Sequence, residues 1–236
     1  MNYALTDLPD SGKEPVVYMD IGLKGEPLGK IQIRLFRDVF PAGVENFVKL
    51  AAGKTFKVEP RGDGKYKYQK ETKRSYEGSK FFRLSHNNYI VGGDIYHNNG
   101  ATAGTIYNDQ PIPAIFGDYY YPHDTKGLVS LVPFKDENNN KLYYDSTFMI
   151  TLDDAKPSNV LSDLDSDQIV IGQVISGMDV LDKINQLIKP YAGRKYPEFY
   201  ILRSDVYRPK SGFRRIRPMS RSDRKKFNKP PQKLNE

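Results

Sequence analysis

Alternating apolar and polar positions near the start of the chain predict two β-strands. Residues 29–36, GKIQIRLF, place an apolar side chain at every second position, with Gln32 and Arg34 between them. A two-residue period is typical of a strand that buries one face. The apolar segment 16–23 precedes these residues, and the KGEP that separates the two segments is rich in turn-forming residues. We therefore expect a β-hairpin.

Two other segments have a three- to four-residue period, which predicts helices. In residues 41–53 the apolar side chains recur on one helical face, with Pro41 suited to the first turn and Gly53 to the position just past the end. Residues 176–188 repeat this pattern, and Ser176 is the expected N-cap.

Six further runs are short, aromatic or β-branched, and separated by turn residues. We expect strands at residues 80–84, 89–91, 127–132, 147–152, 169–174 and 199–207. Many strands with only two helices predict a mostly β protein, built as a closed antiparallel barrel that the helices cap.

Composition limits the chemistry available to the 236-residue chain. It has no cysteine, which excludes disulfides, thiol catalysis and cysteine-ligated metal. His86, His97 and His123 lack metal-ligand spacing, and the acidic run 163–168 is not followed by the Gly and Glu of a calcium loop. We therefore expect neither a cofactor nor a metal.

Two further patterns bear on localisation. No window approaches the roughly 18 continuous apolar residues of a membrane span. The first residues lack the basic and apolar regions of a secretory signal. The expectation is an intracellular protein without membrane contact.

The net charge of +7 is concentrated at the C-terminal end. Residues 208–236 hold eleven of the 36 Lys and Arg and two of the 29 Asp and Glu, a charge of +9. The remaining 25 basic and 27 acidic residues leave positions 1–207 near neutral, unlike a nucleic-acid-binding domain. The tail composition predicts disorder. The tail could bind nucleic acid or an acidic partner, or it could be solvated without a partner.

The order of several motifs along residues 16–207 identifies a family. These motifs are VYMDIGLKGEPLGKIQIRLFRDVFPAGVENFVKL, YEGSKFFRL, GGDI, NNG, KGLVSL, STFMITL and VIGQVISGMDVLDKI. In this order they resemble the cyclophilin family of peptidyl-prolyl isomerases. The resemblance implies an eight-stranded barrel with two capping helices at 16–207, between an N-terminal arm (1–15) and the basic tail (208–236). Composition and an altered pocket further indicate a giant-virus member of the family, for which a place in the virion is expected.

Isomerase chemistry requires a group that favours the twisted amide. Rotation about a peptide bond faces a barrier of about 18–20 kcal/mol, and a guanidinium aimed at the proline nitrogen stabilises the lone pair that appears as conjugation is lost. The resemblance places Arg83, in FFR, at the position of the family's catalytic arginine. The alternative is an ordinary strand arginine paired with a carboxylate such as Asp94.

The remaining pocket positions that the resemblance implies are largely substituted. They fall on Asn88, Tyr89, Val91, Val132, Pro133, Phe134, Thr147, Met149, Asp163, Leu164 and Gln168. Only Leu164 keeps the family's residue; Asn88 replaces a phenylalanine, Val91 and Thr147 replace glutamines, and Asp163 replaces a tryptophan.

These changes predict poor or absent isomerase activity. A buried apolar side chain is worth roughly 1.5–3 kcal/mol and a hydrogen bond on the order of 1 kcal/mol. Pro133 also lacks an N–H. Each loss of about 1.4 kcal/mol in the transition state slows the reaction tenfold.

Two insertions extend the compact family core, near 56–76 and 134–145. The first includes KYKY at 65–68, which could stack on bases or form a solvated loop. Tyrosines at 117–122 could contact another protein or pack on the chain's own barrel. Three functions follow: a binding or assembly module that takes a protein, a proline-containing peptide or a second copy; a weakened isomerase in protein folding; or a nucleic-acid-associated factor acting through the tail.

Overall fold

The computed structural model describes most of the chain. The described residues are 14–53, 55–58, 70–101, 103–107, 109–114, 119–189, 196–207 and 219–220; of residues 55–58, 70–73, 119, 207 and 219–220 only the backbone is described. The predicted arm up to residue 13, the KYKY motif and all of the tail except 219–220 lie outside the described residues.

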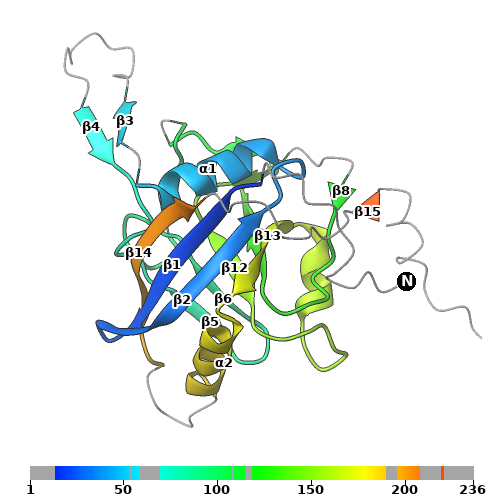
Figure 1. Ribbon diagram of the computed structural model, residues 1–236. Coiled ribbons are helices and arrows are strands. Elements are labelled where there is room, and N and C mark those ends of the chain that lie inside the picture. The colour runs from blue at the N-terminus through cyan, green and yellow to red at the C-terminus, as the bar shows by residue number, and fades with distance from the viewer. Residues whose placement is uncertain are drawn as a thin grey trace, which may run out of the picture.

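One eight-stranded antiparallel sheet forms the body of the protein (Figure 1). Its spatial order is β14-β1-β2-β13-β9-β12-β6-β5. The strands are β1 (Val16–Leu23), β2 (Glu26–Leu35), β5 (Arg83–Ser85), β6 (Tyr89–Gly92), β9 (Leu128–Leu131), β12 (Phe148–Thr151), β13 (Ile169–Ser176) and β14 (Phe199–Tyr207). Each coincides with a strand predicted from the apolar pattern, so the mostly β fold is confirmed.

The predicted hairpin joins β1 to β2 through a two-residue turn. Lys24 and Gly25 both have positive φ, 53° and 89°. Two consecutive positive φ angles match the type I′ turn, whose twist fits that of the flanking strands. The turn therefore sets the pairing of Gly22 and Leu23, and a bulge shifts the register from Ile21 onwards.

The two edges of the sheet approach each other through the segment that precedes β5. Phe81 N–H donates to Phe199 O at 2.9 Å, Ile201 N–H donates to Ser79 O at 2.8 Å, and Lys80 pairs with Tyr200 in an isolated bridge. Residues 79–81 are thus hydrogen-bonded to β14, the opposite edge. Complete closure into a barrel stays a prediction.

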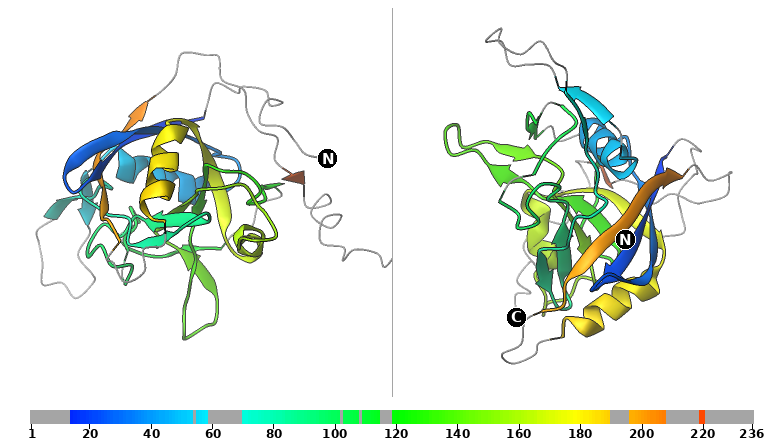
Figure 2. Two further views of the ribbon diagram at one scale, coloured as in Figure 1. Left: turned by 90° about the horizontal axis from the view of Figure 1, so that it is seen from below. Right: turned by 90° about the vertical axis from the view of Figure 1, so that its left-hand side faces the viewer.

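Two α-helices lie at opposite ends of the sheet (Figures 1 and 2). Helix α1 (Pro41–Ala51) begins at its proline as predicted, and Gly53 follows its end with a φ of 58°. Helix α2 (Met178–Leu187) begins later than predicted. That the two helices cap a barrel stays a prediction.

The predicted cap of α2 is wrong. Ser176 is the last residue of β13, because that strand continues two residues beyond the predicted end. The N-cap is Gly177, with a φ of 87° and no side-chain cap. A Cβ at this position would lie 2.2 Å from Lys30 O, so both the conformation and the space require glycine.

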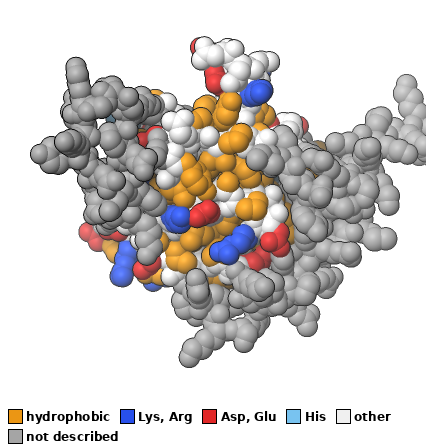
Figure 3. Space-filling view, turned by 90° about the horizontal axis from the view of Figure 1, so that it is seen from above, with side chains coloured by type: hydrophobic (Ala, Val, Ile, Leu, Met, Phe, Trp, Pro, Cys, Tyr) orange, Lys and Arg blue, Asp and Glu red, His pale blue; other side chains and the backbone are white. Residues whose placement is uncertain are grey.

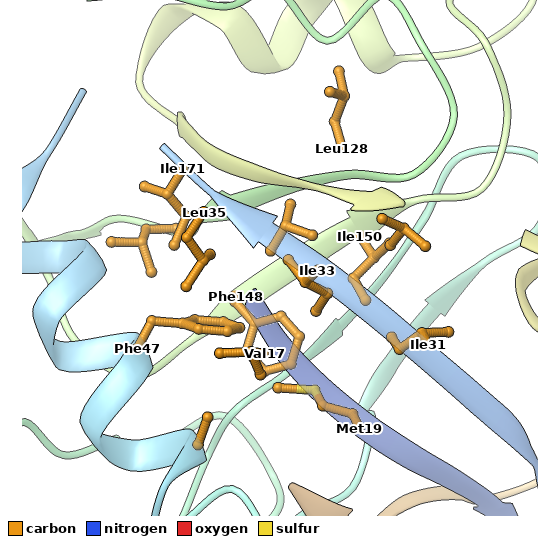
Figure 4. Close-up of a cluster of buried hydrophobic side chains, with 14 of the residues drawn as sticks. Val17, Met19, Ile31, Ile33, Leu35, Phe47, Leu128, Phe148, Ile150 and Ile171 are labelled. Carbon is orange, nitrogen blue, oxygen red and sulfur yellow. The ribbon is translucent and has the colours of Figure 1, made fainter. Parts of the chain in front are cut away.

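In the core, Phe47 of α1 and Phe148 of β12 lie among aliphatic side chains of the sheet (Figure 4). The ring of Phe148 in β12 is edge-on to Phe47 of α1 at 5.1 Å, to Tyr76 at 5.2 Å and to Phe81 at 6.0 Å between centroids. Edge-to-face pairs of this kind add to the free energy of simple burial. Outside, the face over α1 carries many hydrophobic side chains (Figure 3).

Smaller elements add to the main sheet, and sequence analysis did not predict them. Strands β3 (Thr55–Val58) and β4 (Lys70–Lys73) pair within the first insertion. In the second, β10 (Phe134–Lys135) and β11 (Leu142–Tyr144) form a projecting hairpin (Figure 2), and β11 also pairs with β7 (Ile112–Pro113). The tail residues of β15 (Met219–Ser220) pair with β8 (Tyr119–Tyr120). A 3-10 helix, η1, spans Leu161–Ser166.

No helix among the described residues combines the length and apolar character needed to cross a membrane.

The aromatic cluster predicts a strong difference between two phenylalanines. Phe148→Ala should lower the free energy of unfolding by about 3–5 kcal/mol, because its ring is fully buried among aromatic neighbours. Phe134→Ala should cost less than about 1 kcal/mol, because that ring is 40% exposed. Urea unfolding followed by circular dichroism measures both. Equal losses would contradict this assignment of the core.

Candidate functional site

A cavity of about 370 Å³ opens beside the β5–β6 edge of the sheet. It is lined by Phe82, Arg83, Val91, Gly100, Ala101, Ala103, Val132, Pro133, Phe134, Asp145 and Thr147. These residues come from strands β5, β6 and β10, the loop after β6, and the segments that flank β9 and β12. The cavity is therefore assembled from parts far apart in the sequence.

The register of the sheet aligns three of the predicted site residues. Arg83 in β5 is opposite Val91 in β6, and Val91 is opposite Met149 in β12. Residues directly opposite each other in neighbouring strands project from the same face. Arg83 is exposed, whereas Val91 and Met149 are 3% and 1% exposed. A charged group thus stands at the edge of an apolar row.

Arg83 carries a charge that no described residue pairs. Its guanidinium forms no hydrogen bond or ion pair with any described residue. The alternative that Arg83 pairs with Asp94 is therefore wrong. Arg83 is free to meet a group that enters the cavity.

Asp94 is unavailable because its carboxylate organises the loop after β6. It accepts four backbone N–H hydrogen bonds of 2.9–3.0 Å, from Tyr96, His97, Asn99 and Gly100. Burial would raise the pKa of Asp94, but these four bonds outweigh burial and hold the pKa below its usual value. Gly100 itself lines the cavity, so Asp94 shapes the cavity wall indirectly.

Part of the cavity lining is formed by the residues that lead into the projecting hairpin. Val132 and Pro133 follow β9, and Phe134 begins β10. The Phe134 ring stacks on Tyr143 of β11, with 6.1 Å between centroids and 29° between planes. This stacking braces an aromatic side chain at the mouth of the cavity.

Sequence analysis missed a second charged residue of the lining, Asp145. Its carboxylate accepts the backbone N–H of Thr147 at 2.7 Å. Burial raises the pKa of Asp145 and the nearby charge of Asp94 adds to this, which together outweigh the hydrogen bonds from Thr147. The available signal was its position, two residues before Thr147 and at the end of the insertion that borders the pocket.

The comparisons with known proteins decide the family. The family model described as "Cyclophilin type peptidyl-prolyl cis-trans isomerase/CLD" matches residues 18–206. The chain belongs to this cyclophilin-type family.

Three similar proteins illustrate the relationship. The "Structural PPIase-like protein L605" of Acanthamoeba polyphaga mimivirus is 61% identical over 235 residues, covering 100% of both chains. The "Crystal Structure of the Mimivirus Cyclophilin" matches with a TM-score of 0.73 and 60% identity, over 89% of this chain and 97% of that one. The NK-tumor recognition protein of Homo sapiens is 32% identical over 199 residues, which is 84% of this chain and 12% of that protein. The predicted family and the similarity to giant-virus proteins are confirmed.

This cyclophilin-type chain brings together part of the predicted site. Six of its positions line the cavity: Arg83, Val91, Val132, Pro133, Phe134 and Thr147. The other six do not: Asn88, Tyr89, Met149, Asp163, Leu164 and Gln168. Asp163 is exposed on η1, and the buried Oε1 of Gln168 has no hydrogen-bond partner among the described residues.

Asn88 stays out of the cavity lining because its side chain is engaged in the β5–β6 turn. Its amide nitrogen donates to Ser85 Oγ and His86 O, each at 3.0 Å, and its Oδ1 accepts the N–H of Val160 at 3.0 Å. The residue that replaces the family's phenylalanine thus joins the turn to the segment before η1.

Within the described part of the chain, no three His, Cys, Asp or Glu side chains gather as metal ligands.

The hydrogen bonds of Asp94 predict a stability that depends on pH. Asp94→Asn should lower the free energy of unfolding at pH 7 by about 3 kcal/mol, because an amide cannot accept the N–H bonds that one carboxylate oxygen makes. Asp179→Asn, an exposed control whose carboxylate pairs with Lys183, should lower the free energy of unfolding far less.

The direction in which stability changes with pH follows from the lowered pKa of Asp94. The contribution of Asp94 is present above its unfolded pKa of about 3.9 and is lost as pH falls through the lower folded value. The native chain should therefore lose more stability than Asp94→Asn in urea titrations between pH 5 and pH 2. Parallel losses would refute the role of this carboxylate.

Proposed function

We propose that this cyclophilin-type protein is a binding or assembly module with little or no peptidyl-prolyl isomerase activity. One observation carries the proposal. The guanidinium of Arg83 has no partner among the described residues, and the polar side chains that the family resemblance implies beside it have been replaced. Val91 and Thr147 line the cavity where the family resemblance implies glutamines. Arg83 keeps its place, but the groups that would hold a substrate carbonyl beside it differ.

Binding of a proline ring is weakened in three ways. The phenylalanine expected at position 88 is an asparagine engaged in a turn. The side chain of Val91 cannot donate a hydrogen bond to a substrate carbonyl, and this loss costs on the order of 1 kcal/mol. Pro133 in the cavity lining lacks an N–H. Because each 1.4 kcal/mol changes the rate tenfold, two losses of about 1 kcal/mol each at the transition state reduce turnover about thirtyfold.

The surroundings of the cavity support binding rather than turnover. The projecting β10–β11 hairpin places the half-exposed Phe134 at the cavity mouth, and exposed aromatic rings are enriched where proteins meet. The name of the mimivirus relative includes "Structural", which supports a structural role here and, by extension, a place in a virion. Protein partners or a second copy of this chain are the proposed ligands; light scattering of the full chain tests self-association.

The proposal takes the body as a closed barrel with α1 and α2 as its caps. The Lys80–Tyr200 bridge and the hydrogen bonds of residues 79–81 to β14 support closure. A closed body gives the cavity a rigid floor.

A weakened isomerase is the second candidate, and the free guanidinium of Arg83 favours it. Exchange spectroscopy on an Ala-Pro peptide separates the two. We expect cis–trans exchange indistinguishable from that of the peptide alone, and no change on Arg83→Ala. Exchange that is accelerated by the native chain and lost in Arg83→Ala would replace the first proposal with the second.

Restoring polar partners should raise the activity. Val91→Gln combined with Thr147→Gln returns the side chains that the resemblance implies. This double variant should accelerate cis–trans exchange at least about tenfold relative to the native chain. The gain should vanish when Arg83→Ala is added, because the guanidinium performs the step. If the double variant folds, as judged by its urea midpoint, and exchange is not accelerated, the lost glutamines are not what limits activity.

A further inference from the structure

The two charged residues of the cavity lining differ in what surrounds them. Arg83 is exposed, so water solvates its guanidinium. Asp145 is half-buried and forms no ion pair with a described residue. An exposed ion pair contributes little, whereas a partly desolvated carboxylate gains more from a cation. Asp145 is therefore the stronger determinant of which ligand enters.

The charges around Asp145 favour a cationic ligand. Asp94 lies close enough to raise the pKa of Asp145, which indicates a negative local potential. No cationic side chain of the described residues is among the groups that shift the pKa of Asp145. A ligand ammonium or guanidinium would supply the missing charge, and the Thr147 N–H already holds the carboxylate in place.

The chain itself contains segments of matching chemistry. In residues 208–236, three of the four prolines follow a basic residue, as Arg208-Pro209, Arg217-Pro218 and Lys229-Pro230. Among the twelve prolines of residues 1–207, only two do. The tail also carries a charge of +9, so its charge is opposite to that of Asp145.

Proline contributes to this match through the backbone rather than by filling a pocket. A residue that precedes proline is restricted to extended conformations, so less conformational entropy is lost when it binds. An extended Lys-Pro segment presents its ammonium group away from the backbone. The altered lining beside Arg83 therefore does not prevent such a segment from binding.

Chain length sets how far the tail can reach. The tail continues for 29 residues past Tyr207, which at about 3.3 Å per extended residue is on the order of 90 Å. Beyond Ser220, the end of β15, nine residues lead to Lys229, a span of up to about 30 Å.

We propose that the cavity binds the chain's own basic tail, through a Lys-Pro or Arg-Pro pair whose cationic side chain pairs with Asp145. The inference rests on the proposed function, because it names the ligand of the same binding cavity. It assigns Asp145 as the residue that determines specificity. Isomerase turnover is not part of this contact.

The test uses the full chain with its own motifs neutralised, so that they do not compete. The host carries Arg208→Gln, Arg217→Gln and Lys229→Gln. A fluorescent peptide of residues 225–236 is the probe, and its anisotropy measures binding. We expect saturable binding that weakens at least about tenfold with Asp145→Asn in the host. Glu77→Gln, which removes one exposed negative charge outside the cavity lining, should leave the affinity unchanged.

A change on the ligand side keeps the test independent of folding. A probe peptide with Lys229→Gln should bind the triple-variant host, with Asp145 intact, at least about tenfold more weakly than the native peptide does. In ¹⁵N spectra, the native chain and the triple variant should differ at Arg83, Gly100 and Thr147. Equal binding with Asp145→Asn, or differences confined to other regions, would overturn the proposal.

Three further outcomes separate this proposal from others. If the triple variant loses salt-sensitive RNA binding while the cavity resonances stay unchanged, the tail is a nucleic-acid segment and the proposal fails. Accelerated Ala-Pro exchange together with Asp145-dependent probe binding would remove the claim of low activity and leave the tail proposal standing. Absence of both exchange and probe binding would remove the tail proposal alone.

Discussion

The four hydrogen bonds that Asp94 accepts are the interaction on which the cavity depends. They hold the loop after β6, and with it Gly100, in the cavity wall. They also satisfy the one carboxylate that sequence analysis offered as a partner for Arg83. Because Asp94 is committed to the backbone, the guanidinium of Arg83 remains available to a ligand. The conformation of the loop after β6 and the absence of a described partner for Arg83 are therefore both linked to the carboxylate of Asp94.

The sheet and the hairpin insertion complete the site around this loop. The registers of β5, β6 and β12 place Arg83, Val91 and Met149 in one row, and Phe134 from the insertion also lines the cavity. The lining therefore includes a cationic residue, Arg83, an anionic residue, Asp145, and apolar residues such as Val91 and Val132. Such a lining suits a peptide with a defined charge better than a neutral proline ring, which is why binding and turnover are expected to separate in this protein.

The fold was more predictable than the site. All eight main strands were found because each has a short apolar or alternating run between turn residues, and that signal is local. The helix cap at Ser176 was misplaced because pairing with β2 extends β13 through that residue, which is a tertiary effect. Asn88 was expected in the pocket by position alone, yet its amide is used by a turn and by Val160. Asp145 was overlooked because Asp94, whose charge helps to raise its pKa, is brought near it only by folding. Local periodicity therefore identifies elements, while long-range contacts decide which side chains form a site.

The most direct test of the central claim is a crystal of the full chain soaked with an Ala-Pro dipeptide. The account predicts that no proline ring is ordered beside Arg83, because the side chains that would hold it have been replaced. A proline ring seated against the Arg83 guanidinium, with its carbonyl hydrogen-bonded to the cavity wall, would contradict it.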